Sequence, residues 1–148
     1  MRLSLSAVEW HSGSWKFDAD GVFTPGIHLI SGRVGSGKTT LALLSSRLLR
    51  PDAGRVEYDG IGSRTLSFQH PEYHVTGSTL GEEAGSYGVD PSAACVRAGL
   101  AGREGEDPFR LSRGELKRFQ LACILMRTWD LIIIDEPFAA LDPLNTQM

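Results

Sequence analysis

Residues 32–39 read Gly-Arg-Val-Gly-Ser-Gly-Lys-Thr and lie just after the mostly apolar run 27–30. Glycine lacks a Cβ, so it adopts positive φ without strain and lets backbone amides come close to an anion. This stretch offers that freedom at three positions, Gly32, Gly35 and Gly37. The pattern Gly-x4-Gly-Lys-Ser/Thr between a strand and a helix predicts a phosphate-binding loop, in preference to a glycine-rich turn with an incidental lysine.

The loop leads into a helix expected over residues 38–49, and Pro51 lies just beyond its end. The partly positive N-terminus of this helix would point at the bound phosphates. Lys38 can reach the β and γ phosphates of a nucleotide, and Thr39 offers a hydroxyl to Mg²⁺. The sequence thus predicts a site for a nucleotide and Mg²⁺.

Composition favours an ordinary globular domain. The chain has 148 residues, of which 41% are hydrophobic and 22% charged. A net charge of −3 gives no electrostatic reason to expect a nucleic-acid partner. We interpret Cys95 and Cys123 as buried apolar residues in a reducing compartment, since neither has metal-ligand spacing. With no apolar run long enough to span a membrane, a cytosolic protein is expected, touching a membrane only through a partner.

Hydrophobic periodicity predicts strands followed by an inserted, mostly helical lobe whose packing is loose or partner-dependent. The expected strands are residues 1–10, 14–23, 27–30, 55–58, 65–69 and 131–134. After the first helix, helices are expected over 79–87 and 91–100, and a stronger one opens at 111–115, where a serine and an early glutamate suit capping.

The apolar run 131–134 is expected to be a parallel strand buried on both faces, and two carboxylates follow it. Ligands bind at this edge of open α/β sheets. Beside a phosphate-binding loop, Asp135 can hold Mg²⁺ through water and Glu136 can activate the water that attacks the γ phosphate. Without such a loop, the pair would be read as a solvated strand end.

Taken together, these segments resemble the ATP-binding cassette (ABC) ATPases over nearly the whole chain. Residues 111–115 (Leu-Ser-Arg-Gly-Glu) look like the family signature, and Gln69 looks like the Q-loop glutamine. Residues 140–142 (Ala-Leu-Asp) look like the D-loop, and Trp10 like the aromatic residue that stacks on adenine. The segments 68–72 and 79–83 are similar to the Q-loop region of energy-coupling factor transporter ATPases.

The resemblance implies an α/β fold: a P-loop NTPase (RecA-like) core with antiparallel N-terminal strands and an inserted helical subdomain. Residues 1–69 and 116–148 would form the core lobe, and residues 70–115 the helical lobe. The cofactors implied are ATP and Mg²⁺. The implied partners are a second ABC ATPase subunit, identical or not, and integral membrane transporter subunits, with the chain on the cytoplasmic face of the membrane.

The resemblance also assigns roles to residues. Two subunits would face head to tail, so that the signature of one completes the phosphate shell of the other. A helix N-terminus is a second anion site, which supports this reading, although a plain helix cap is the alternative.

Gln69 would contact Mg²⁺ or the lytic water and report the phosphate state to the helical lobe; alternatively it is a solvated strand end. Asp142 would contact the other subunit or merely form a turn. Trp15 could take the stacking role instead of Trp10, which would then be a core residue.

The expected site residues fall into three groups. Catalysis is assigned to Lys38, Gln69 and Glu136. Metal binding is assigned to Thr39, Gln69 and Asp135. Nucleotide binding is assigned to Trp10, Gly32, Gly35, Ser36, Gly37, Lys38, Thr39, Thr40, Ser112, Gly114, Glu115 and Asp142.

This chain departs from the family pattern at several points, and its helical lobe, residues 69–111, is expected to be shorter than usual. Arg113 stands where the family commonly has a glycine, and Ala140 where a serine is frequent. Met148 follows the D-loop after a few residues, so the C-terminal part of the fold is expected to be missing. We therefore expect nucleotide binding to survive better than hydrolysis.

The leading hypothesis is the ATPase subunit of a membrane importer, of the energy-coupling factor type, that takes up a vitamin or a metal ion. A long coiled insertion or a basic patch would favour a soluble ABC ATPase of nucleic-acid repair or translation, and the sequence shows neither. A catalytically incomplete nucleotide-binding module is the alternative that a missing C-terminal part favours. A small-molecule P-loop kinase would leave the signature and D-loop segments unexplained.

Overall fold

The computed structural model describes residues 1–136, which divide into two compact units. The first contains residues 1–66 and 129–135, and the second contains residues 67–128 and Glu136. The lobe boundaries expected from the sequence remain a prediction. The elements in chain order are β1 (Arg2–Ser12), β2 (Trp15–Phe23), α1 (Lys38–Ser46), β3 (Ala53–Asp59), β4 (Arg64–Ser67), the 3₁₀ turn η1 (Pro71–His74), α2 (Leu80–Ser86), α3 (Pro91–Arg97), the 3₁₀ turn η2 (Pro108–Arg110), α4 (Arg113–Leu125) and β5 (Leu131–Ile134).

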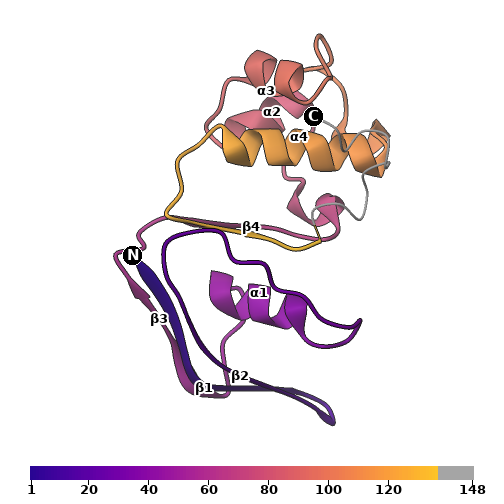
Figure 1. The fold of residues 1–148 in the computed structure, drawn as a ribbon. Coiled ribbons are helices and arrows are strands. Elements are labelled where there is room, and N and C mark those ends of the chain that lie inside the picture. Colours follow the sequence, from indigo (N-terminus) through magenta and orange to yellow (C-terminus); the bar gives the residue numbers. More distant parts are fainter. Residues whose placement is uncertain (137–148) are drawn as a thin grey trace. The chain divides into compact units, whose positions relative to one another are not determined.

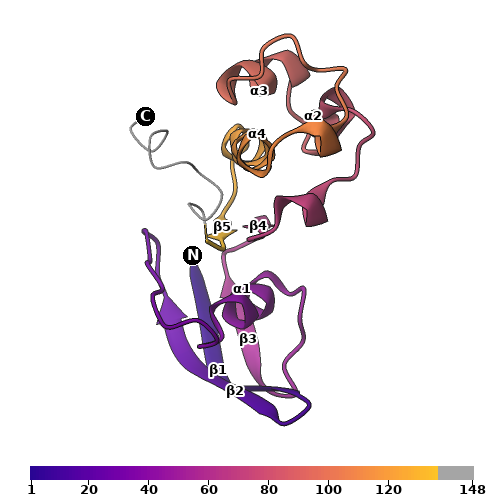
Figure 2. The same cartoon turned by 90° about the vertical axis from the view of Figure 1, so that its right-hand side faces the viewer.

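The first unit is built on an antiparallel sheet in which β1 lies between β2 and β3. The alternation of apolar and polar residues along β1 turns Leu3 and Leu5 toward one face, as the sequence predicts. Ala7, expected on the same side, is exposed instead, because the register shifts between Leu5 and Val8 and Ala7 adopts φ 45°. Helix α1 covers this face in both views of the fold (Figures 1 and 2) and inserts the fully buried Leu44. This packing fixes the helix that follows the phosphate loop.

The apolar run 27–30 is not the buried strand that the sequence predicts. The structure assigns no strand there, and all four side chains are exposed, Ile27 and Leu29 almost completely. A strand needs a neighbour that pairs with its backbone groups, and the described sheets consist of β2-β1-β3 and β4-β5 alone. The prediction failed because apolar composition does not supply a pairing partner.

Other boundaries also differ from expectation: α3 ends at Arg97 rather than at residue 100, and β4 ends at Ser67 rather than at residue 69. Helix α1 ends at Ser46 rather than at residue 49, because Arg47 adopts φ 64° and so leaves the helical conformation. Strand β5 has the expected bounds but is only half-buried, and its last residue, Ile134, is exposed. It pairs with β4, and Asp130 ties the two together by accepting bonds from the N–H groups of Gly62 (2.9 Å) and Ser63 (2.8 Å).

The second unit is a cluster of short helices, and it is not loosely packed. The segments expected to be helical form α2, α3 and α4, which pack together beside η1 (Figure 1). Side chains at 0% exposure fill their centre: Leu80, Ala84, Ala94, Cys95, Phe119 and Cys123. Both cysteines are free and buried, as expected. Within residues 1–136, no helix is long and apolar enough to cross a membrane.

Candidate nucleotide site

The phosphate loop, residues 32–39, ends in the first turn of α1. Gly35 and Gly37 adopt φ 80° and 91°, as the sequence predicts, and Gly37 is the N-cap of α1. Gly32 does not adopt positive φ, contrary to expectation. A Cβ on Gly32 would lie 2.6 Å from the Oγ of Ser36, so this glycine serves close packing within the loop. The loop curvature therefore depends on backbone conformations that other residues adopt only with strain.

Lys38 is the first residue of α1, and its side chain reaches back across the loop. The Nζ atom donates to the carbonyl oxygens of Gly32 (3.0 Å) and Arg33 (3.2 Å). The ammonium therefore lies against the loop backbone and near the N-terminus of the helix. An anion held by the loop amides would meet this charge directly.

Thr39 and Asp135 meet although 96 positions separate them in the sequence. The Thr39 hydroxyl donates to Asp135 Oδ2 at 2.7 Å, and Asp135 is buried with 7% of its surface exposed. The contact arises because α1 packs on β5, which ends one residue before Asp135. The structure thus brings together two hard oxygen donors beside the phosphate loop, as Mg²⁺ prefers.

Glu136 lies in the second unit and contacts Gln69. Its backbone adopts φ 47°, in the left-handed region that is unusual for a residue other than glycine. Its Oε2 accepts a hydrogen bond of 2.5 Å from Gln69 Nε2. The sequence predicts that Gln69 contacts the metal or the lytic water. In the structure Gln69 contacts the carboxylate that is predicted to activate that water.

The signature segment forms the N-terminus of α4 through a capping box. Ser112 is the N-cap, and its Oγ accepts from the N–H of Glu115 at 3.3 Å. In return, Glu115 Oε2 accepts from the Ser112 N–H at 2.9 Å and from its hydroxyl at 2.7 Å. Arg103 Nη1 adds a bond of 2.7 Å to Glu115 Oε1. The Ser112 hydroxyl, Arg103 and the backbone bond together lower the pKa of Glu115 to about 2. The capping expected from the sequence is confirmed.

Arg113, the departure from the family glycine, points toward the segment after Gln69. Its Nη2 contacts His70 Nδ1 and donates to Glu72 Oε1 at 3.3 Å. The signature segment and the residues that follow Gln69 are thus joined by a side chain that the usual glycine lacks. Local sequence patterns carried no signal for this contact, because 43 positions separate Arg113 from His70.

Trp10 and Trp15 are the two candidates for the aromatic residue that stacks on a nucleotide base. Trp10 is half-buried and packs against the core cluster of the first unit. Trp15 is 39% exposed, with its ring centroid 5.8 Å from that of Trp10 and 6.0 Å from that of Phe17. A Cβ on Gly37 would lie 3.4 Å from Cη2 of Trp15, so this ring lies at the end of the phosphate loop. Its position makes Trp15 the better placed of the two.

For the remaining predicted site residues, the structure gives only their position and exposure. Ser36 is exposed in the loop, Thr40 is half-buried in the first turn of α1, and Gly114 is half-buried in the first turn of α4. Asp142 lies outside the described residues. In residues 1–136 no group of three or more His, Cys, Asp or Glu side chains could hold a metal, so a metal here would depend on a smaller set of protein ligands.

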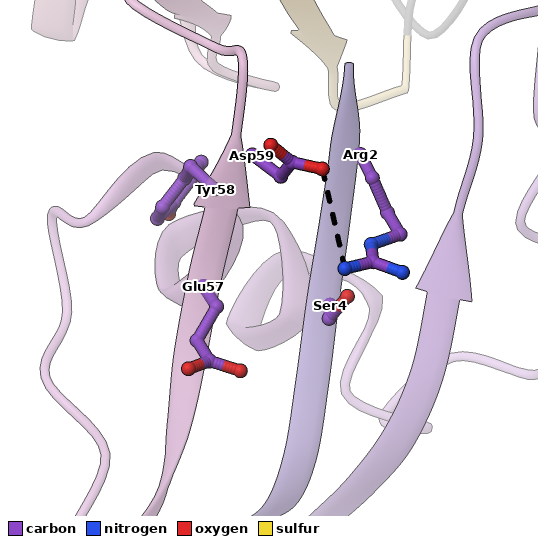
Figure 3. A pocket seen from close by; sticks show the side chains of 5 residues that line it. All are labelled: Arg2, Ser4, Glu57, Tyr58 and Asp59. Carbon is purple, nitrogen blue, oxygen red and sulfur yellow. Dashed lines mark ion pairs between the residues drawn. The ribbon is translucent and has the colours of Figure 1, made fainter.

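A shallow pocket of about 250 Å³ lies on β1 and β3 of the first unit. Figure 3 shows its lining of Arg2, Ser4, Glu57, Tyr58 and Asp59, with the ion pair of 4.0 Å between Arg2 and Asp59. The lining is polar and open to solvent, and it contains no residue predicted to bind nucleotide.

Sequence reasoning missed two polar residues on the buried face of α4. Lys117 and Gln120 are 1% and 0% exposed, and both donate hydrogen bonds to the segment around Gln69. A signal existed for Gln120, which follows Leu116 by four positions and therefore shares its face of the helix, whereas Lys117 directly follows Leu116 and lies about 100° around the helix from it. A buried lysine needs a partner.

The sequence is similar to those of known proteins. Residues 22–139 match the family model described as ABC transporter. The chain is 31% identical to the energy-coupling factor transporter ATP-binding protein EcfA1 of Thermotoga maritima, over 97% of this chain and 63% of that protein. It is 35% identical to the energy-coupling factor transporter ATP-binding protein EcfA2 of Symbiobacterium thermophilum, over 77% of this chain and 48% of that protein.

A solved structure, a putative ABC transporter ATP-binding protein of Pyrococcus furiosus, is similar with a TM-score of 0.72 at 18% identity. The alignment covers 97% of this chain and 79% of that one, which confirms the predicted fold class. The chain spans less than two thirds of the length of the two curated relatives above. The family match over residues 22–139 shows that the chain belongs to the ABC transporter family.

Proposed function

We propose that the chain binds and hydrolyses ATP with Mg²⁺ and thereby energises transport through integral membrane subunits. The observation that carries the proposal is the bond between Thr39 and Asp135 beside the phosphate loop. A structural turn has no need of a buried carboxylate against the hydroxyl that follows the loop lysine. A site for a nucleotide and a divalent cation requires both groups.

In this proposal the loop binds the phosphates through backbone amides and Lys38. The positive φ of Gly35 and Gly37 supports such a cradle, and Ser36, Thr39 and Thr40 belong to the same binding segment. Lys38 would exchange its bonds with the loop carbonyls for bonds to the β and γ phosphates. The adenine base would stack on Trp15 or Trp10, and the proximity of Trp15 to Gly37 favours Trp15.

Thr39 and Asp135 fit a Mg²⁺ ion. Their oxygens are hard donors at adjacent positions, and Mg²⁺ in phosphate sites takes one or two protein ligands alongside water and phosphate oxygens. An ion held by these two residues would neutralise negative charge on the phosphates. Asp135 would hold it directly or through water.

Glu136 would accept the proton of the attacking water. Its contact with Gln69 supports this role, because an amide donor on one carboxylate oxygen fixes the orientation of the group and leaves the other oxygen to accept from water. Gln69 then acts as the group that aims Glu136. We propose that Gln69 also contacts the metal.

The transport role would need two ATPase subunits in head-to-tail contact. The N-terminus of α4, with Ser112, Gly114 and Glu115, would complete the phosphate shell of the other subunit, and Asp142 would contact that subunit. Energy-coupling factor transporter proteins among the relatives support a membrane partner, with this chain on the cytoplasmic face. The net charge of −3 supports the absence of a nucleic-acid partner.

Phosphate release from Mg-ATP, measured together with nucleotide binding, tests the proposal. Lys38→Ala should abolish both, because it removes the phosphate-binding ammonium. Glu136→Gln should retain binding and lose turnover by roughly 10²-fold or more. Lys16→Ala and Glu57→Gln are matched surface controls, since both residues lie on the sheet of the first unit in exposed ion pairs.

The outcomes separate the candidate functions. Turnover that both Lys38→Ala and Glu136→Gln abolish supports the transporter ATPase. Binding that depends on Lys38, without turnover in the wild type, would identify a nucleotide-binding module instead. Binding that survives Lys38→Ala unchanged would contradict the site itself.

A further inference from the structure

We propose that Lys117 and His74 are positioning residues that clamp the peptide groups of Phe68 and thereby set Gln69 against Glu136. The proposal rests on the proposed ATPase function for its effect on rate. The contacts themselves do not depend on that function. They all lie within the second unit, which contains Phe68, Gln69, His74, Lys117 and Glu136.

Lys117 carries the first half of the clamp. The side chain is 1% exposed, and its Nζ donates to Ser67 Oγ at 3.0 Å and to the carbonyl oxygen of Phe68. Removing an ammonium from water is costly unless it is fully bonded, and an uncharged side chain of similar length would fill the same space more cheaply. Packing alone therefore does not explain a lysine at this position. Its bonds act on the residue just before Gln69.

His74 carries the second half. The Phe68 N–H donates to His74 Nε2 at 3.0 Å, so Nε2 acts as an acceptor and must be unprotonated. Burial and the nearby charge of Lys117 lower the pKa of His74, and the charge of Glu83 on α2 acts in the opposite direction. The lowered pKa keeps the ring neutral near pH 7. Both backbone groups of Phe68 are thus held by side chains.

The contacts of α4 with this segment extend along one face of the helix. Arg113, Lys117 and Gln120 follow the i, i+4, i+7 spacing that places side chains on one face. Arg113 contacts His70 and Glu72, and Gln120 Nε2 donates to the carbonyl oxygen of Pro71 at 2.7 Å. Gln69 lies inside the segment that these bonds hold.

Immobilising Phe68 matters because Gln69 follows it directly. The Gln69 side chain has rotamer freedom, and its bond of 2.5 Å to Glu136 requires a fixed starting point in the backbone. Small displacements of groups that orient a catalytic residue cost large factors in rate. The clamp therefore controls how often the amide of Gln69 faces the carboxylate of Glu136.

The first test does not need ATP turnover. The side-chain amide of Gln69 is followed by NMR in the full chain, and assigned by its loss in Gln69→Ala. In Lys117→Met, this amide should exchange faster with solvent and shift toward its position in Glu136→Gln, while Lys117→Arg should preserve the wild-type signal. The pKa of His74, measured in the same spectra, should rise in Lys117→Met because a nearby positive charge is removed. Lys16→Met is the surface control.

The second test uses the rate. In Lys117→Met, kcat for Mg-ATP should fall by roughly 10- to 100-fold, with KM within about twofold of the wild type, and Lys117→Arg should restore kcat. If the wild type shows no turnover, the proposed function fails, and the NMR measurement still decides the present proposal.

Folded Lys117→Met protein with an unchanged Gln69 amide would overturn the proposal. If Lys117→Met does not fold, His74→Leu removes the acceptor on the other side of the same residue without altering α4. The clamp then predicts faster exchange of the Gln69 amide in His74→Leu, and an unchanged amide would overturn it equally.

Discussion

The two units hold their predicted functional residues by different means. In the first unit, the phosphate loop relies on backbone conformation: Gly35 and Gly37 take positive φ, and the helix begins directly afterwards. In the second unit, the segment around Gln69 relies on side chains, notably the buried Lys117 and Gln120. A binding loop for a common ligand needs amides at fixed positions, whereas a single catalytic side chain needs its neighbours to aim it. The two units should therefore respond differently to substitution.

The largest effect is expected at a buried carboxylate that supports the second unit. Glu83 is 0% exposed, and its Oε2 accepts from the N–H groups of Thr76 (2.8 Å) and Gly77 (2.9 Å) and from the Thr76 hydroxyl (3.1 Å). Glu83→Ala leaves these donors without their acceptor and should lower the free energy of unfolding by about 3–5 kcal/mol. Urea unfolding followed by circular dichroism measures the loss.

The neighbouring Glu82 provides the control for Glu83. It is exposed, and its Oε2 accepts from the Ser78 N–H at 2.8 Å. Glu82→Ala should lower the free energy of unfolding by about 1 kcal/mol or less, because water replaces the lost acceptor. Equal losses in the two variants would contradict the view that buried side-chain bonds hold the second unit.

A backbone substitution should have the next largest effect, in the first unit. Gly37 has φ 91°, and a Cβ there would lie 2.5 Å from Cδ2 of Phe17. Gly37→Ala should lower the free energy of unfolding by about 1–3 kcal/mol and weaken binding of Mg-ATP correspondingly. Thermal unfolding and calorimetric titration measure the two effects.

Gly85 gives the matched control, because it lies in α2 without positive φ, and a Cβ added to it would meet nothing within 4 Å. Gly85→Ala should raise the free energy of unfolding by about 0.5–1 kcal/mol, since alanine favours helix more than glycine does. If Gly37→Ala behaved like Gly85→Ala, the loop would not depend on backbone conformation.

A third prediction concerns the ring at the loop. Trp15→Ala should weaken ATP affinity by roughly 5- to 100-fold, because stacking of a base on an aromatic ring contributes about 1–3 kcal/mol. Trp10→Ala should have a smaller effect on affinity, since Trp10 packs against the core. Calorimetric titration of both variants with Mg-ATP gives the comparison, and a larger loss of affinity in Trp10→Ala would reverse the assignment.

The sequence predicted features that depend on local pattern. The phosphate loop, the capping box of Ser112 and Glu115 and the bounds of β5 each follow from residue types at short spacing. A hydroxyl after the loop lysine and a carboxylate after an apolar strand mark Thr39 and Asp135 as candidate Mg²⁺ ligands. Their direct contact is not predictable from local pattern, because nothing local relates positions 96 residues apart.

The features that sequence missed depend on distant partners. The run 27–30 has strand composition, yet a strand forms only where another strand offers backbone groups. The contact of Arg113 with His70, and that of Lys117 with Phe68, join segments more than 40 positions apart. The burial of Lys117 and the identity of its partner both required the fold, because Lys117 does not share the helix face of Leu116 and Phe119.

The smallest predicted effect is the pH dependence of the stability that Glu115 contributes at the N-terminus of α4. It tests whether side-chain charge holds the second unit. The pKa of Glu115 is lowered to about 2 by the Ser112 hydroxyl, Arg103 and the Ser112 backbone. A carboxyl whose pKa is lower in the folded chain stabilises it above its unfolded pKa of about 4.3, and this stabilisation is lost as pH falls toward 2. Unfolding of wild type and Glu115→Gln between pH 6 and about 2 should therefore show their difference in stability shrinking with acid. A difference that stays constant would mean that Glu115 caps α4 equally well when protonated, so that side-chain charge would matter less in the second unit than its contacts imply.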